Sequence, residues 1–178
     1  MGQAPEAWLS GPVEGVLPHL VPVAHALVQV RRDLEAAAAG LTPDELWTRP
    51  GGAASVGFHL RHVAGVLDRL LTYARAEELT EKQMRALRSE GQPGEPPADA
   101  ATLVRAARAA IDRALDQVRA TTPASLLEPR AVGRQRFPSI VLGLLYHAAE
   151  HATRHAGQAV TTTTILRGGA GVSRPAPS

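Results

Sequence analysis

The sequence predicts an all-α protein that folds as a four-helix bundle, and three observations support this. Apolar residues recur at alternating intervals of three and four positions in four long stretches, which is the spacing of helices that bury one face. Aromatic residues make up only 3% of the 178 residues whereas hydrophobic residues make up 44%, so the core must be aliphatic and rich in alanine. Glycine and proline cluster between the four stretches, where helices end.

The length suits a single domain. We expect the bundle to occupy residues 13–167, after an N-terminal arm of residues 1–12 and before a C-terminal tail of residues 168–178. Trp8 and Leu9 are expected to pin the arm to the bundle. The tail lacks apolar periodicity and is expected to be flexible.

The expected helices have recognisable starts. Ser55 is a typical N-cap, Thr80 would cap a short helix over residues 79–90, and Pro138 suits a first helical turn. Pro18 and Pro22 lie in the early turns of the first helix, so that helix is kinked or begins late. A connection as long as residues 77–97 allows the second and third helices to run parallel. The long helices are expected at residues 13–39, 56–76, 98–120 and 138–166, with a single helical turn at residues 42–45.

Composition excludes several classes of function. The chain has no cysteine, so it forms no disulfide, and a metal site would have to use histidine and carboxylate ligands. The formal net charge is only +2 and the arginines are scattered, so no nucleic-acid partner is expected. The N-terminus does not have the pattern of a signal peptide, and no apolar run approaches the length of a membrane span. We therefore expect a soluble, cytoplasmic protein without a membrane partner.

The segment Tyr146–Gln158 carries histidines four residues apart, at positions 147, 151 and 155. On a helical wheel, His155 falls near the middle of the apolar arc and His151 nearer its edge. A desolvated imidazole needs a partner for its ring nitrogens, and a divalent metal ion serves two imidazoles at once. A hydrogen-bonded pair of core histidines is the alternative. The zinc-protease motif is absent, because Ala152 and not glutamate follows His151.

The second helix carries two further candidates, His59 and His62. The helical wheel places His59 deeper in the apolar arc and His62 at its edge, so periodicity favours His59 as the buried group. His19 and His25, in the first helix, are expected at the surface or at an interface.

Two segments together resemble the DinB/YfiT-like superfamily, and the similarity spans about residues 8–166. The first segment, RPGGAASVGFHLRHVAGVLDRLLTYA, has a histidine followed by a small apolar turn in the second helix. The second, HAAEHATRHAGQ, has His-x-x-x-His before Gly-Gln in the fourth. The family often has His-His-Arg-Gly-Gln at the end of this motif, where this chain has Arg154-His155-Ala156-Gly157-Gln158.

The resemblance implies an up-down-down-up four-helix bundle, a homodimer, and a divalent metal held by three histidines at one end of the bundle. By position, the implied metal ligands are His62, His151 and His155. His59 and His147 then become candidates for contacts with the ligands or with substrate. For the metal ligand from the second helix, the helical wheel favours His59 and the family motif favours His62. We expect His62.

Three imidazoles would leave a coordination position open for water or substrate, as in catalytic metal sites. Imidazole suits zinc, nickel, iron or copper, so the ligands alone do not choose the metal. We expect zinc or nickel, with iron, manganese or copper as alternatives. The resemblance implies a metal-dependent transferase or a hydrolase-like enzyme, such as an S-transferase acting on a small thiol and an electrophile. A non-catalytic metal-binding stress or interaction protein and a purely structural helical dimer are the other hypotheses. Glu150 is expected to point away from the histidines, so the sequence identifies no general base.

Overall fold

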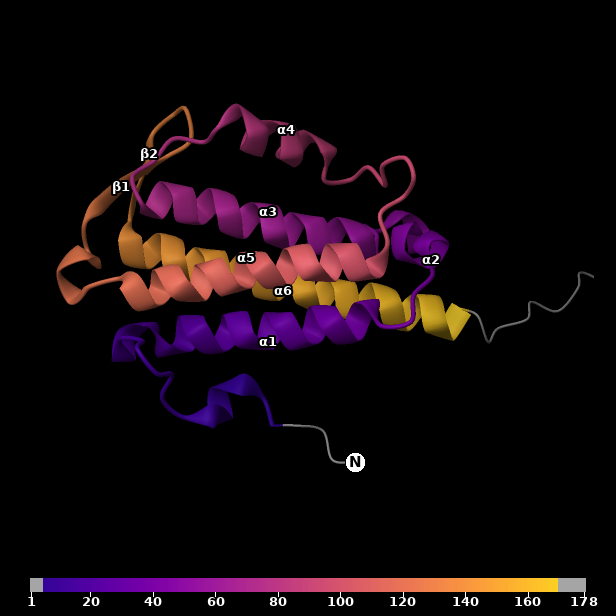
Figure 1. The fold of residues 1–178 in the computed structure, drawn as a ribbon, viewed down its shortest axis with the longest axis horizontal. Coiled ribbons are helices and arrows are strands. Elements are labelled where there is room, and N and C mark those ends of the chain that lie inside the picture. Colours follow the sequence, from indigo (N-terminus) through magenta and orange to yellow (C-terminus); the bar gives the residue numbers. More distant parts are fainter. Residues whose placement is uncertain (1–4, 170–178) are drawn as a thin grey trace, which may run out of the picture.

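The computed structural model describes residues 5–169, and Figure 1 shows most of them in helices. The all-α prediction is confirmed in this broad form, although a small antiparallel hairpin is also present. The four long helices are α1 (Val21–Ala38), α3 (Val56–Ala74), α5 (Ala100–Ala120) and α6 (Val141–Gly169). The shorter elements are α2 (Pro43–Trp47), α4 (Glu81–Ser89), β1 (Pro129–Val132) and β2 (Phe137–Ile140).

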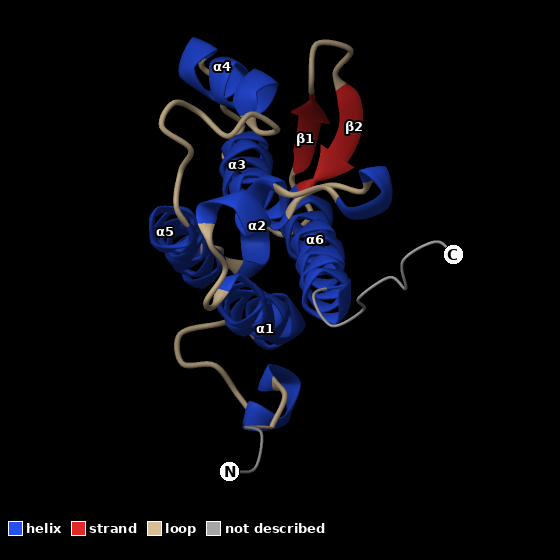
Figure 2. Cartoon of the chain, turned by 90° about the vertical axis from the view of Figure 1, so that its right-hand side faces the viewer, coloured by secondary structure: helices blue, strands red, loops and turns tan. Residues whose placement is uncertain are grey.

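The long helices lie side by side. In the end-on view of Figure 2, α5 and α6 lie on opposite sides between α1 and α3, and each of them packs against both. In Figure 1, α1 and α6 run from left to right, whereas α3 and α5 run from right to left. The crossover that carries α4 passes along the outside of α3. It therefore returns the chain to the end of the molecule at which α3 began.

Helix starts follow the polar residues that precede them. The side chain of Ser55 accepts a hydrogen bond from the backbone N–H of Phe58 at 3.2 Å, and Asp99 accepts one from Thr102 at 2.6 Å. Thr80 forms a capping box at the start of α4. Such caps contribute about 1 kcal/mol each. The predicted caps at Ser55 and Thr80 are therefore confirmed, and α5 begins at Ala100, two residues later than predicted.

The core is aliphatic, as predicted. Its largest fully buried side chains are leucine, isoleucine and valine, and each contributes roughly 1.5–3 kcal/mol by leaving water. Alanines of α5 and α6 fill the positions between them and allow the helices to approach closely. Representative members from the four long helices are Leu27, Leu60, Ile111, Leu145 and Ala152.

Two long helices begin later than their predicted ranges, and for the first of them a late start was one of the two expectations drawn from its prolines. The first long helix begins at Val21 and not at residue 13, because Pro18 opens a separate 3-10 turn and Pro22 lies in the first turn of α1. The last begins at Val141, because Pro138 lies in β2, opposite Ala131 of β1. Proline has no N–H to donate to a neighbouring strand. It is tolerated here because both strands of a two-stranded sheet are edge strands.

The N-terminal arm is attached differently from the prediction. Residues Ala7–Ser10 form a 3-10 turn in which Ala7 is buried, while Trp8 and Leu9 are 64% and 58% exposed. The backbone N–H of Ala7 donates to Oε1 of Gln29 at 3.0 Å. The arm is thus held by its backbone, and the expectation that Trp8 and Leu9 pin it was wrong. At the other terminus α6 reaches Gly169, and residues 170–178 of the predicted tail lie outside the described residues.

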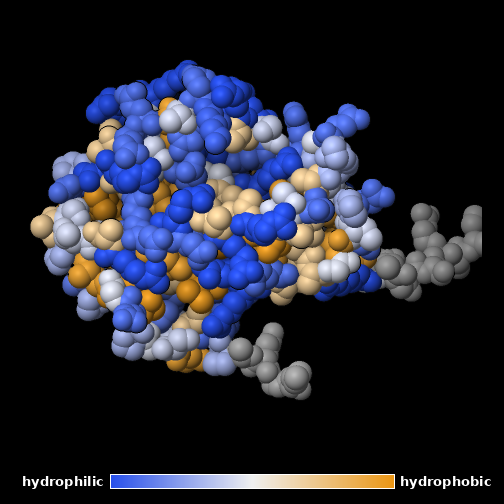
Figure 3. Space-filling view, viewed as in Figure 1, coloured by the Kyte–Doolittle hydropathy of each residue, from blue (hydrophilic) through white to orange (hydrophobic). Residues whose placement is uncertain are grey.

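The surface in Figure 3 is hydrophilic over most of the visible face, with hydrophobic residues in smaller patches between the helices. Large apolar side chains nonetheless remain exposed within residues 5–169, among them Trp8, Leu127, Phe137 and Tyr146. Over the same residues, no helix combines the length and the apolar character that a membrane span requires.

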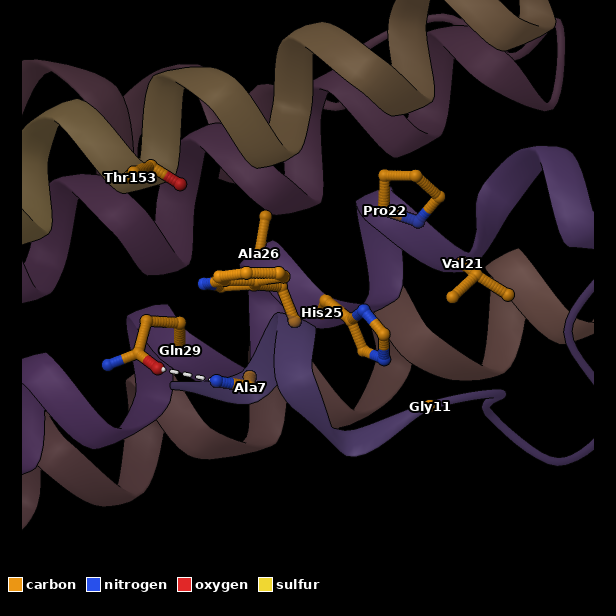
Figure 4. A pocket seen from close by; sticks show the side chains of 9 residues that line it. Ala7, Gly11, Val21, Pro22, His25, Ala26, Gln29 and Thr153 are labelled. Atoms are coloured by element: carbon orange, nitrogen blue, oxygen red, sulfur yellow. Dashed lines mark hydrogen bonds between the residues drawn. The ribbon is translucent and has the colours of Figure 1, made fainter. Parts of the chain in front are cut away.

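His25 was expected at the surface or at an interface, and the structure shows that it is buried within this chain. It is 8% exposed because the arm lies across this part of α1. Its ring lines a cavity of about 600 Å³ together with Pro22, Ala26 and Gln29 (Figure 4). Nε2 of His25 is buried and has no hydrogen-bond partner among residues 5–169. A helical wheel cannot predict this burial, because the arm that covers His25 is not part of the helix.

Replacing His25 by phenylalanine is expected to stabilise the protein. The substitution keeps a ring but removes the unpaired nitrogen, and a buried polar group without a partner costs about 1–3 kcal/mol. The free energy of unfolding, measured by urea titration, should rise by about 1 kcal/mol. A lower value in His25→Phe would show that this nitrogen has a stabilising partner.

Candidate metal centre

Four histidines meet at the interface between α3 and α6. His59 and His62 lie in the first two turns of α3, and His151 and His155 lie near the middle of α6. Each pair is spaced three or four residues apart, which places its members on one face of the helix. Because α3 and α6 are antiparallel neighbours, these two faces meet. The cluster lies along the side of the two helices, within the first turns of α3.

Three of these histidines are close enough to share a ligand. One ring nitrogen from each of His62, His151 and His155 lies within 4.8 Å of the others. Nε2 of His62 is 3.0 Å from Nε2 of His151, and the rings of His62 and His155 have centroids 4.2 Å apart. Zinc bound tetrahedrally at about 2.0–2.1 Å from each nitrogen would separate the nitrogens by roughly 3.4 Å. The spacing is compatible with such an ion.

The remaining two candidates lie on either side of this trio. His59 is only 3% exposed, and its Nδ1 lies 3.0 Å from Nδ1 of His155. His147 is exposed, and its Nδ1 lies 3.3 Å from a carboxylate oxygen of Glu150. The helical wheel therefore predicted the burial of His59 correctly, whereas the family motif selected the histidine of α3 that joins His151 and His155.

Sequence reasoning missed Glu90, which lies just beyond α4 in the crossover. Its Oε2 accepts a hydrogen bond from Nδ1–H of His62 at 2.7 Å, and its Oε1 accepts one from Arg69 at 2.6 Å. The residue is 5% exposed. Since a carboxylate can only accept, the hydrogen of this bond is on Nδ1 of His62, and in the neutral form of the ring Nε2 then has the lone pair. Such a partner holds a ligating imidazole in one tautomer and orientation.

The space for Glu90 comes from Gly65. A Cβ atom at Gly65 would collide with Oε1 of Glu90 and would lie 2.7 Å from Nη1 of Arg69. Gly65 and Arg69 follow His62 at intervals of three and seven, and so lie on its face of α3. Gly65 and Arg69 on the same helix face as His62 could have indicated a buried carboxylate beside this histidine. They could not have indicated that the carboxylate is Glu90.

Glu150 is occupied by other partners. Its carboxylate pairs with Arg154 at 2.8 Å as well as with His147. Arg154 also lies 3.4 Å from Nδ1 of His151. A metal on Nε2 of His151 would require the proton on Nδ1, and Arg154 would then keep only its contacts with Glu150. Glu150 is therefore a poor general base, as the sequence indicated.

Burial lowers the pKa of three of the clustered imidazoles, those of His59, His151 and His155. Desolvation, together with the positive charge of a protonated His62, lowers the pKa of His59 to about 4 and that of His155 to about 3. Burial is also the largest cause that lowers the pKa of His151. At neutral pH these rings therefore have lone pairs free to bind a metal. The donor set fits a divalent ion with imidazole ligands.

One comparison with known proteins gave a match. The model of one family, described as the DinB superfamily, matches residues 26–159. This range includes His62, His151 and His155 and most of the four long helices. A search of curated proteins found no match.

The metal-free protein is expected to lose stability in acid. The pKa values of His59 and His155 lie below the ordinary value of 6.5, so the unfolded chain takes up protons first as the pH falls. The stability that these neutral rings provide is complete above pH 6.5 and declines towards pH 4. Urea titrations with chelator at pH 7 and pH 5 should show a smaller decline in His59→Gln than in the wild type.

The exposed His19 offers a matched control, because His19→Gln changes a histidine that is not buried. It should retain the wild-type decline. An equal decline in His59→Gln and the wild type would contradict the assignment of the pH dependence to the buried cluster.

Proposed function

Because the chain belongs to the DinB superfamily, we propose that it is a metal-dependent enzyme that binds one divalent ion through His62, His151 and His155. The observation that carries this proposal is the proximity of three ring nitrogens, one from each residue, all within 4.8 Å of one another. They come from two helices that are distant in sequence. Two of them, from His62 and His151, already lie 3.0 Å apart.

Each ligand has an assigned nitrogen. His62 offers Nε2 because its Nδ1–H is bound to Glu90. His155 offers Nε2 when its Nδ1–H donates to Nδ1 of His59, which lies 3.0 Å away. His151 offers Nε2, the nitrogen that faces His62. Three such ligands suit zinc or nickel, and also iron, manganese or copper.

The proposed reaction is the transfer of a small thiol to an electrophile. A bound divalent ion lowers the pKa of a coordinated thiol or water, so it can supply a thiolate or hydroxide near neutral pH. The protein residues around the site favour thiol chemistry over proteolysis. Glu90 and Glu150 are both paired, and Ala152 follows His151 where a zinc protease has its glutamate. A thiol that releases its proton to solvent when it binds needs no separate protein base. The new S–C bond would form as the bond between carbon and leaving group of the electrophile breaks, and the leaving group would depart with the displaced electron pair.

We also propose the up-down-down-up bundle and the homodimer that the family suggests. The helix directions in Figure 1 support the first. The second is supported by an apolar groove of about 340 Å³ between α1 and α6, where Tyr146 is exposed beside Pro22, Ala26 and Ala149. The cytoplasmic location remains a prediction.

A non-catalytic metal-binding protein is the second candidate. One observation favours it: the carboxylates of Glu90 and Glu150 are both paired, so neither is free to act as a general base at the site. This candidate predicts the same metal content without turnover. The third hypothesis, a structural helical dimer, predicts protein that contains no metal.

Metal content tests the ligand assignment directly. Wild-type protein purified without an affinity tag should contain about one equivalent of divalent metal by elemental analysis, and His151→Ala/His155→Ala should contain almost none, because one remaining imidazole binds weakly. His147→Ala is the matched control, since His147 lies on the same helix but is exposed. Full metal content in the double variant would refute the proposed site.

Turnover distinguishes the enzyme from a metal-binding protein without activity. The metal-loaded wild type should accelerate the reaction of a low-molecular-weight thiol with an alkylating electrophile, and chelator should abolish the acceleration. The double variant should show only the uncatalysed rate. A metal-loaded protein that accelerates none of a panel of thiols would favour the non-catalytic candidate.

A further inference from the structure

The crossover between α3 and α5 is held against α3 mainly by polar contacts. The side-chain amide of Gln83 donates to Asp68 and Thr72, in each case at 2.9 Å. Further along the crossover, Arg61 of α3 donates to the carbonyl oxygens of Gln92 and Pro93. Between these two attachments, Glu90 accepts from His62 and Arg69. The contact with His62 connects the crossover to the candidate metal centre.

Apolar burial contributes little to this attachment. No residue of α4 is buried, and Leu87 is exposed. Within residues 81–97, all of which are described, Glu90 alone is buried. A hydrogen bond contributes only about 1 kcal/mol net, and a buried ion pair gains little over its desolvation cost. The crossover can therefore detach at a lower free energy than global unfolding requires.

Detachment would change His62. When the crossover is docked, the carboxylate of Glu90 holds the proton of His62 on Nδ1 and directs Nε2 towards His151. Without Glu90, either nitrogen of His62 can carry the proton and the ring can turn. Loss of such an outer partner weakens metal affinity by about 10- to 100-fold in known sites.

We infer that docking of the crossover through Glu90 and binding of the divalent ion are thermodynamically coupled. The inference rests on the proposed metal function. Coupling is reciprocal, so if docking strengthens metal binding by a given factor, metal binding strengthens docking by the same factor. Glu90 is thus a positioning residue for His62. The crossover is expected to be docked more firmly when the metal ion is bound than when it is not.

Two variants separate this role from a general structural one. Glu90→Gln removes the charge but keeps the size of the side chain. Gly65→Ala changes no charge, yet its Cβ occupies the space of the Glu90 carboxylate. The matched control is Glu78→Gln, which changes an exposed glutamate of the same crossover. Thermal midpoints measured without metal give the structural cost of each substitution separately.

The experiment is hydrogen–deuterium exchange of the full chain, with and without saturating zinc, together with zinc affinity by calorimetry. In the wild type and Glu78→Gln, zinc should slow exchange of the amides in residues 84–92 by about 10-fold or more. In Glu90→Gln and Gly65→Ala, zinc should bind about 10- to 100-fold more weakly, and the added protection of this segment should be lost.

The outcomes are distinguishable. Zinc that binds the wild type without slowing exchange in the crossover would overturn the coupling and leave the metal site intact. Wild-type zinc affinity in both Glu90→Gln and Gly65→Ala would also overturn it. If zinc does not bind the wild type at all, the proposed function fails, and the inference fails with it.

Discussion

The close packing of α3 against α6 is the constraint on which the site depends, because neither helix carries all three candidate ligands. The side of α6 that carries His151 and His155 also carries Ala148, Ala152 and Ala156, all buried. Small side chains allow two helix axes to approach towards the short end of the usual 8–10 Å range. At that separation, imidazoles projecting from both helices can reach one point. The buried alanines of α6 therefore favour the close helix packing that brings histidines from two helices together.

Burial of so many polar groups in an aliphatic core requires that each has a partner. The cluster meets this requirement as one connected unit. Arg69 neutralises Glu90, Glu90 accepts from His62, and the rings of His59 and His155 are in contact. In such a network each bond depends on its neighbours, and the removal of one member leaves another without its partner. The polar cluster therefore ties α3, α6 and the crossover together at a place where apolar packing alone would not specify their register.

Much of the fold was predictable because helix periodicity and capping are local. The starts at Ser55, Thr80 and Asp99 follow from one side chain and the backbone three residues later. The hairpin at Pro129–Ile140 was not predicted, since each strand has only four residues. Its turn depends on the positive φ angles of Gly133 and Arg136, and four residues give too little periodicity to recognise a strand.

The candidate site was predictable only where it depends on a single helix. A helical wheel treats one helix at a time, so it correctly indicated that His59 is buried. It could not show that the less buried His62 is the residue that meets His151 across the interface. Glu90 lies 28 residues after His62, and its position depends on how the crossover docks. The burial of His25 likewise depends on the arm. These features come from tertiary contacts between segments that have no sequence pattern in common.

The charges around the cluster indicate what the open position of the proposed site would accept. Glu90 is neutralised by Arg69, and Glu150 is paired with Arg154. The three candidate ligands are imidazoles, and those of His151 and His155 have pKa values lowered by burial. The protein therefore supplies little net negative charge to balance a divalent ion. An uncompensated cation in a partly desolvated site favours an anion as its next ligand. A thiolate or hydroxide meets that requirement, whereas a neutral amine does not, so this charge balance fits either anion as the next ligand of the proposed site.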